Sequence, residues 1–563
     1  MKPSILIQVR LTAALLITGL LAGCETYNST AKDYSVAWKG AQLQSSVDET
    51  SKQAAKATAD KSAKDLVVWH LEQGTVLRTA ALANLPVMPP APPKGSVPPG
   101  APVVTPQPVA NDETRASWFK QSNDAFGEAF TQVTVFDEQA KTKLRAETKA
   151  VLTNLAQMPY RGTGYDNVML HTYVAANYLA LGDRDRVRVE LNRLLQSQRD
   201  AVEAHAKQIA EAQDEAAKAK AGTLATDATA KPADATKPEP AKSDSPSLLG
   251  LFGGKSAPKT TTAAAEAKKP AADNSFDSDA TLKDPKFAAV VGGLEKEINA
   301  KLCGYESYVN PFSVFLDGLY FATCGSDGAD IERAHKSFER VAGMNPTNSY
   351  LKDDLAMAED LANGKKAGGL TYVIFETGSA PHQEEWKIDI PLFAFSQKMP
   401  NVIIALPKLA FNDQFVPSLT VTAAGKSYPS ALVCNMDGVV AQEFKNNWPA
   451  VLTKSLISAA IKASADAVTA KYNADHPSTT SFLVNMAVKI SNVATTVADT
   501  RSWTSLPKQF HYARFATPEN RSVSLNVGGV EQVVALAQGD INLVWVKSVQ
   551  PGSPVYVAQT VLR

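Results

Sequence analysis

The sequence has no excess of charge of either sign. Its 563 residues include 57 lysines and arginines and 57 aspartates and glutamates, so the formal net charge is zero. Without a broad basic field the chain has no long-range attraction for a phosphate backbone, and we expect no nucleic-acid partner. Beyond the N-terminal segment, no stretch holds the roughly 18 uncharged apolar residues that a membrane-spanning helix needs. We therefore expect no membrane helix in the body of the chain.

Recognisable catalytic and metal-binding motifs are also missing. None of the seven histidines sits in an H-E-x-x-H pattern or another zinc spacing; they are His70, His171, His205, His335, His382, His476 and His511. The sequence has no C-x-x-C pair, no G-x-S-x-G elbow, no Walker A loop and no G-x-G-x-x-G turn that opens a helix. We predict no metal, no cofactor and no catalytic residue, and we do not expect an enzyme.

Residues 1–23 have the layout of a bacterial export signal. Lys2 and Arg10 supply positive charge before the uncharged apolar run Leu11–Leu21. This run is too short to be a stable membrane span. It ends in small residues, which suit the narrow pocket of a signal peptidase. We therefore expect residues 1–23 to be a signal peptide.

The tetrapeptide Leu21-Ala22-Gly23-Cys24 resembles the lipobox of bacterial lipoproteins. The resemblance implies that Cys24 becomes the new N-terminus and carries several fatty acyl chains. One chain anchors a protein only marginally, whereas several hold it firmly to a membrane. The next residue is Glu25 rather than the aspartate that resembles an inner-membrane retention signal. The expected location is the periplasmic face of the outer membrane.

Three cysteines remain when Cys24 is set aside: Cys303, Cys324 and Cys434. Cys303 and Cys324 are predicted to end two successive antiparallel helices, which places them at opposite ends of the pair. A helix of about 13 residues is roughly 20 Å long, whereas a disulfide tolerates at most about 7 Å between Cα atoms. We predict buried free thiols, and a pairing of Cys434 with either of the others stays open.

Shifts in composition divide the rest of the chain. Residues 24–85 are predicted to be helical, with apolar residues at helical spacing between Leu66 and Leu77. Residues 86–113 form a proline-rich linker that is either an extended spacer or a disordered insert. Residues 221–283 are composed mostly of Ala, Lys, Asp, Thr, Pro and Ser, and we predict a disordered linker because they offer too little apolar surface to offset chain entropy.

Residues 114–220 and 284–366 are predicted to contain paired helices that resemble tetratricopeptide repeats. In the first pair, Gly182 is expected to end one helix in the left-handed conformation and Asp183 to cap the next. Small and large side chains alternate around this turn as the repeat requires; they are Ala175, Tyr178, Val187, Leu191 and Leu194. In the second pair the matching residues are Gly318, Tyr320, Ala334, Phe338 and Pro346, across a longer turn at residues 325–330.

Residues 367–563 change to a strand-rich pattern. Strands are predicted near residues 371–375, 386–390, 402–406, 419–421, 430–433, 523–527, 541–545 and 555–557. A helical hairpin interrupts them; the apolar face of its first helix begins at Leu452, and that of its second runs from Phe482 to Val497. The fold class is therefore α+β, with N-terminal repeat-like helices and a C-terminal, mostly antiparallel sheet domain.

One polar and aromatic cluster joins the hairpin to the following strands. It contains Asp499, Arg501, Trp503, His511 and Tyr512. As an exposed patch it would bind a partner, because Trp, Tyr and Arg dominate interface hot spots. In the structural alternative, Asp499 pairs with Arg501 and Trp503 fills the junction between hairpin and sheet. We favour the structural alternative and keep the partner site as a second hypothesis.

Several stretches together resemble an uncharacterised family of proteobacterial outer-membrane lipoproteins. They are the lipobox, DLVVWHLEQGTVLR at residues 65–78, the repeat-like helices and ADTRSWTSLP at residues 498–507. The resemblance gives no catalytic residues and directs the partner prediction toward cell-wall assembly. We predict a lipid-anchored scaffold or adaptor for an envelope protein. The alternative is a hydrolase or binding protein for an envelope polymer, with a pocket in the C-terminal domain lined by converging carboxylates or by Asp499, Arg501 and His511.

Overall fold

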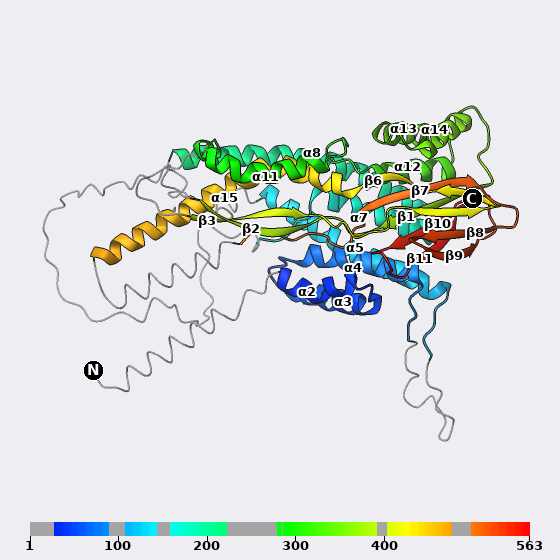
Figure 1. The fold of residues 1–563 in the computed structure, drawn as a ribbon, viewed down its shortest axis with the longest axis horizontal. Helices are drawn as coiled ribbons and strands as arrows, with labels where there is room; N and C mark the ends of the chain where they lie inside the picture. The colour runs from blue at the N-terminus through cyan, green and yellow to red at the C-terminus, as the bar shows by residue number, and fades with distance from the viewer. Residues whose placement is uncertain are drawn as a thin grey trace, which may run out of the picture.

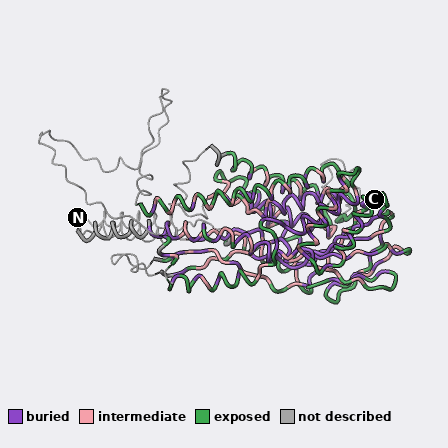
Figure 2. Tube along the Cα trace, turned by 90° about the horizontal axis from the view of Figure 1, so that it is seen from above, coloured by how far each residue is buried: buried purple, intermediate pink, exposed green. Residues whose placement is uncertain are grey.

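Sheets and helices are both extensive, which confirms the predicted α+β class. The computed structural model describes residues 27–88, 107–142, 158–221, 278–283, 285–390, 402–475 and 497–563. The molecule is elongated: two sheets lie at one end, and long helices and a two-stranded ribbon extend toward the other (Figure 1). Buried residues gather around the sheets and the helices that cover them (Figure 2).

A five-stranded sheet has the order β11-β10-β1-β7-β6. Its strands are β1 (Leu370–Thr377), β6 (Ala431–Asn435), β7 (Gln509–Ala516), β10 (Ile541–Ser548) and β11 (Tyr556–Val561). Strands β1 and β10 are parallel, and the other neighbours are antiparallel. The prediction of a largely antiparallel sheet is confirmed, but β7 was missed, although it lies beside β1 in this sheet.

A four-stranded antiparallel sheet packs on one face of the first. Its strands are β4 (Leu419–Ala423), β5 (Lys426–Pro429), β8 (Ser522–Val527) and β9 (Val530–Ala535), in the order β5-β4-β8-β9. Alternate residues of the facing strands form one apolar cluster between the sheets; among them are Val373, Val421 and Leu525. Side chains alternate across a strand, so the intervening residues Tyr372, Tyr512 and Trp545 join a second core that the helices cover.

The N-terminal region contains three helices rather than one continuous helical run. They are α2 (Tyr27–Lys39), α3 (Leu43–Ala59) and α4 (Leu66–Ala83). The predicted apolar residues between Leu66 and Leu77 all lie in α4 and are buried. A helix buried on every side is a core helix, and α4 lies against β10 and β11 while α3 covers it. Figure 1 shows α2 and α3 as the outer layer on this side.

The proline-rich stretch leaves the body and returns to the same place. The backbones of Val87 and Val109 exchange two hydrogen bonds of 2.9 Å in an antiparallel bridge. Helix α5 (Asp112–Thr142) then packs on α4, slightly earlier than predicted. Because its two ends meet, the stretch is an insertion between α4 and α5 and does not separate them. Residues 89–106 lie outside the described residues.

The first predicted helix pair is present as α7 (Gly164–Ala180) and α8 (Arg184–Lys220). Gly182 has a φ of +75°, and Asp183 accepts a hydrogen bond from the backbone N–H of Arg186, as expected. The second helix continues to Lys220, the end of the predicted helical range. Whether this pair is a tetratricopeptide repeat stays a prediction.

The second pair is α12 (Pro311–Cys324) and α13 (Gly328–Met344), followed by α14 (Ser349–Ala362). The turn is shorter than predicted because Asp327 caps α13 by accepting from the N–H of Asp330. Gly318 faces the ring of Phe338, and a Cβ atom at residue 318 would lie 2.9 Å from it. This small-against-large contact is the packing that the sequence pattern predicts.

Long helices and a ribbon extend from the body at the end opposite the sheets (Figure 1). We call the C-terminal half of α8, α11 (Pro285–Lys301) and α15 (Met436–Asp475) the helical arm; α10 (Ser278–Leu282) contacts α8 and α15. Helix α15 begins well before the predicted hairpin helix, and the predicted second helix lies outside the described residues except for Val497, which is not helical. Strands β2 (His382–Ile390) and β3 (Val402–Ala410) form the ribbon, and β3 contacts α15.

The three described cysteines are free, which agrees with the prediction of free thiols. Their predicted burial holds only in part: Cys434 is buried, Cys324 is half-buried and Cys303 is exposed. Cys303 is exposed because α11 ends at Lys301 and the thiol lies in the connection that follows.

Candidate functional site

Asp499, Arg501 and Trp503 of the predicted cluster lie in a segment that runs from residue 497 to residue 508, which we call the strap. The strap crosses the helical layer before entering β7. Within it, Arg501 donates to Asp499 through Nε at 2.8 Å and through Nη2 at 2.5 Å. The same guanidinium donates to the backbone carbonyls of Lys64 and Met158 at 2.7 and 2.8 Å. The predicted pairing of Asp499 with Arg501 is confirmed, and Arg501 also ties the strap to the start of α4.

Trp503 is buried among helices, not at the place that the sequence suggested. Its Nε1 donates to the hydroxyl of Thr75 on α4 at 2.8 Å. Its ring lies 5.7 Å from that of Phe126 on α5 and 6.0 Å from that of Tyr173 on α7. The Trp503 indole fills space between packed elements, as the structural interpretation predicts. These elements are α4, α5 and α7, so the predicted position of Trp503 between the hairpin and the sheet is wrong.

Glu72 on α4 is the main attachment of the strap. Its carboxylate accepts from the N–H groups of Thr504 and Ser505 at 2.6 and 3.1 Å, and from both hydroxyls at 2.7 and 2.5 Å. The hydroxyls of Tyr27 and Tyr34, both on α2, donate to it at 3.3 and 2.7 Å. Burial raises the pKa of Glu72, although these hydrogen bonds counteract it. One carboxylate therefore joins α2, α4 and the strap.

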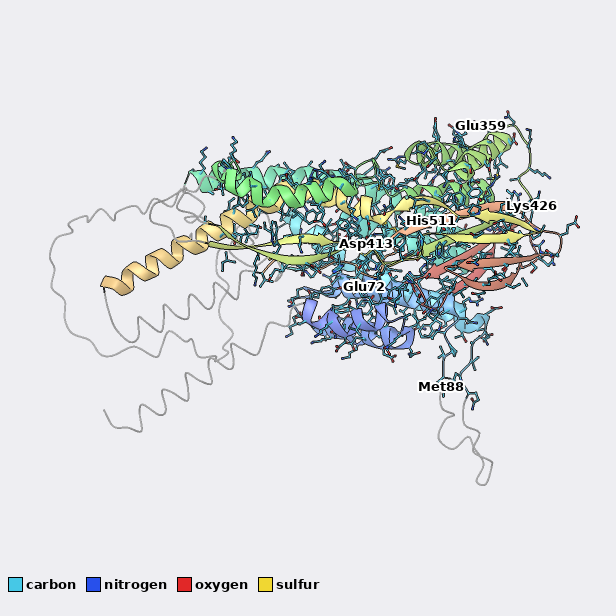
Figure 3. All side chains as sticks on the ribbon, viewed as in Figure 1. Glu72, Met88, Glu359, Asp413, Lys426 and His511 are labelled. Carbon is cyan, nitrogen blue, oxygen red and sulfur yellow. The ribbon has the colours of Figure 1, made fainter. Side chains whose placement is uncertain are left out.

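His511 and Tyr512 lie on opposite faces of β7, so they do not form one patch with the strap. His511 lies between the two sheets near Phe375, and burial lowers its pKa to about 4, which leaves the imidazole neutral at pH 7. The hydroxyl of Tyr512 points the other way and donates to Asp354 of α14 at 2.6 Å. Figure 3 shows Glu72 beside the α2–α3 layer and His511 among the strands.

Four of the five predicted partner-site residues are buried: Arg501, Trp503, His511 and Tyr512. Asp499 is the partly exposed one. A partner cannot reach the buried four while the strap keeps this conformation. Asp499 and Arg501 pair with each other in the strap, whereas His511 lies between the two sheets, so these three residues do not line one pocket.

The structure brings together buried charges that the sequence analysis did not identify. Glu376 on β1 accepts from Trp545 Nε1 at 2.6 Å, Lys547 Nζ at 2.9 Å and the Tyr173 hydroxyl at 3.0 Å. Arg78 of α4 lies 3.6 Å from the same carboxylate and over the Trp545 ring at 4.3 Å. Burial alone would raise the pKa of Glu376, but Lys547 and Arg78 outweigh it and hold the pKa below its ordinary value.

A small cleft lies where α7 begins against α15. Glu443 of α15 accepts from the backbone N–H groups of Gly164 and Tyr165 at 2.6 and 2.9 Å, and so caps α7 from outside. Burial raises the pKa of Glu443 to about 7, although the two hydrogen bonds oppose the rise. The cleft, which Tyr305 and Tyr308 also line, has a volume of about 10 Å³. That is room for about one water molecule and not for a substrate.

The buried polar groups act mainly as connections between layers. Glu72 and Glu376 each receive donors from at least two different segments, and Glu443 of α15 receives two from α7. Such buried hydrogen-bond networks favour one arrangement of the layers. Sequence reasoning missed them because each acidic residue lies in a helical or strand pattern with no motif. The one available signal was a charged residue inside an apolar run, as with Glu72.

Within the described ranges, no group of three or more His, Cys, Asp or Glu side chains is arranged to hold a metal ion. No helix in this part of the chain is both long and apolar enough to cross a bilayer. Comparison of the chain with protein families, with curated proteins and with solved structures finds no match. The lipoprotein family that the sequence motifs resemble therefore stays a prediction.

Proposed function

We propose that this chain is a lipid-anchored scaffold of the bacterial envelope that holds a protein partner at the periplasmic face of the outer membrane. The lipobox-like Leu21-Ala22-Gly23-Cys24 supports the anchor. The helical arm supports the scaffold, and it is the observation on which the proposal depends. Cell-wall assembly is the process toward which the family resemblance points.

The arm is long and continuous with the core, and its α8 portion is mostly exposed. Helix α8 has 37 residues and is therefore about 55 Å long. Its C-terminal half buries small residues such as Ala212 and keeps most other side chains exposed. Lys454 of α15 lies 4.0 Å from both Glu211 and Glu215 of α8, which ties the two helices together. A stiff helical surface that extends from a packed body suits the presentation of one protein to another.

Site-specific photocrosslinking in cells tests this proposal. A photoreactive residue would replace Val202 on the arm, where the side chain is 53% exposed. The matched control would replace Val533 on β9, an aliphatic residue that is 72% exposed at the other end of the molecule. We expect the arm position to give an adduct of defined mass with an envelope protein and the control to give none. Equal adducts at both positions, or none on the arm, would contradict the scaffold proposal.

A further inference from the structure

Tyr27, the first residue that the structure describes, is only three residues after Cys24. A chain spans at most about 3.6 Å per residue, so the α-carbons of Cys24 and Tyr27 are at most about 11 Å apart. Tyr27 is the first residue of α2. An anchor at Cys24 is therefore linked to α2 by a connection much shorter than the body is wide.

Helix α2 is fixed to the core at its first residue. Tyr27 is 6% exposed, its ring lies 5.1 Å from that of Trp69, and its hydroxyl donates to Glu72 and to the carbonyl of Ser502. Two turns later, Tyr34 is fully buried and donates to Glu72 at 2.7 Å. Because α2 is held at two points along its length, it cannot swing away from the body as a tether.

Neither of the two long inserts can lengthen the connection between Cys24 and the body. The proline-rich stretch begins and ends at the Val87–Val109 bridge, and α10, which follows the 222–277 segment, contacts α8, which precedes it. Neither insert lies between Cys24 and Tyr27. The distance between anchor and body is set by residues 24–27 alone.

We infer that the α2 side of the body lies against the phospholipid headgroup layer of the bilayer that holds the Cys24 acyl chains. This inference rests on the proposed lipid anchor. The facing surface, which we call the proximal surface, consists of the exposed side of the first turns of α2 and the loop between α3 and α4. The end of that loop lies near the start of α2, because the Tyr27 hydroxyl donates to the carbonyl of Ser502 and the neighbouring Arg501 donates to the carbonyl of Lys64 at 2.7 Å.

The proximal surface is polar and nearly balanced in charge. Lys32 and Lys61 are exposed on it, and so are Asp33 and Asp60. Such a surface can lie in the headgroup layer without burying an unpaired charge, and the acyl chains supply the binding free energy. Helices α13 and α14 lie on the opposite side of the body in Figure 1, so they face away from the membrane.

The test measures the depth of two labels on the acylated full-length protein in phospholipid vesicles. A fluorophore is attached at Lys61→Cys on the proximal surface or at Lys336→Cys on α13, in a Cys303→Ser and Cys324→Ser background. The Lys336 side chain is 70% exposed, so both positions are accessible. The vesicles carry a nitroxide on the lipid headgroup, which quenches only fluorophores close to the surface.

We expect the label at residue 61 to lose most of its emission and the label at residue 336 to lose little. Twenty Gly and Ser residues inserted between Thr26 and Tyr27 add an average reach of about 25 Å and are expected to abolish the difference. Equal quenching at the two positions of the chain without the insert would overturn the inference. Mass spectrometry of the same sample separates the two claims: an unacylated Cys24 refutes the anchor, whereas an acylated Cys24 with equal quenching refutes only the orientation.

Discussion

Replacement of Glu376 by glutamine is expected to destabilise the fold strongly while it preserves the shape of the side chain. Glu376 is fully buried and is the anionic partner of Lys547 and Arg78, which are also buried. The native cluster has two cations and one anion, so Glu376→Gln raises its buried charge from +1 to +2. Breaking a buried ion pair by removing one partner costs about 3–5 kcal/mol, because the remaining charge is left uncompensated.

A double-mutant cycle separates the charge effect from the loss of shape. Glu376→Gln combined with Lys547→Met returns the buried charge to +1, so the double variant is expected to be more stable than the sum of the two single changes predicts. Glu332→Gln is the matched control, because Glu332 pairs with Lys336 at 3.1 Å on an exposed face. An exposed pair contributes only about 0–1 kcal/mol.

Guanidinium-induced unfolding, followed by circular dichroism, measures each free energy of unfolding. The reasoning predicts a loss of about 3–5 kcal/mol for Glu376→Gln and less than about 1 kcal/mol for the control. It would be refuted by a loss below about 1 kcal/mol for Glu376→Gln, or by additivity of the two changes in the double variant.

Three further predictions concern other contacts between helices and strands of the fold. Trp503→Ala removes an indole buried between α4, α5 and α7 and should cost about 3–5 kcal/mol in the same unfolding assay; an effect below about 1 kcal/mol would mean that the strap is not packed as described. Gly318→Ala places a Cβ atom 2.9 Å from the Phe338 ring and should lower the free energy of unfolding by about 1–3 kcal/mol. The control Gly292→Ala adds a Cβ atom that meets nothing within 4 Å and should stabilise α11 slightly. Equal effects of the two changes would contradict the close packing of α12 on α13. The pKa of Glu443 is raised from its ordinary 4.5 to about 7 in the folded state, so this carboxyl binds more protons in the native protein than in the unfolded chain, and its contribution to stability should fall by about 3 kcal/mol between pH 4.5 and 7. Unfolding measured across this range should lose that part of the slope in Glu443→Gln, while Asp166 and Asp354, whose pKa is raised to about 6, leave the remainder; an unchanged slope would exclude Glu443 as a source.

Most strands could be predicted from their β-branched and aromatic residues, including β1 and β10, which are buried on both faces, whereas β5, β7 and β9 were not predicted. Val523, Leu525 and Val527 alternate with polar residues and form β8 as expected. Strand β7 was missed because polar side chains lie on both of its faces: His511 lies between the sheets, whereas Tyr512 and Arg514 turn toward Asp354. A strand whose polar side chains have partners elsewhere in the fold shows no alternation in sequence.

The strap illustrates how much of the candidate site was open to sequence reasoning. Asp499 and Arg501 are two residues apart, and their pairing could be predicted from spacing alone. The contact of Glu72 with Thr504 joins positions 432 residues apart, so no local pattern could reveal it. Exposure could not be inferred from residue type either, since the Trp and Arg side chains that favour interfaces also fill the space between buried layers.

Mass spectrometry of the mature protein from bacterial membranes tests the central claim most directly. The account predicts that the chain begins at Cys24 and carries thioether-linked diacylglycerol and an amide-linked acyl chain on that residue. An intact leader sequence, or a chain that begins near Cys24 without fatty acids, would contradict the membrane anchor and with it the proposed scaffold.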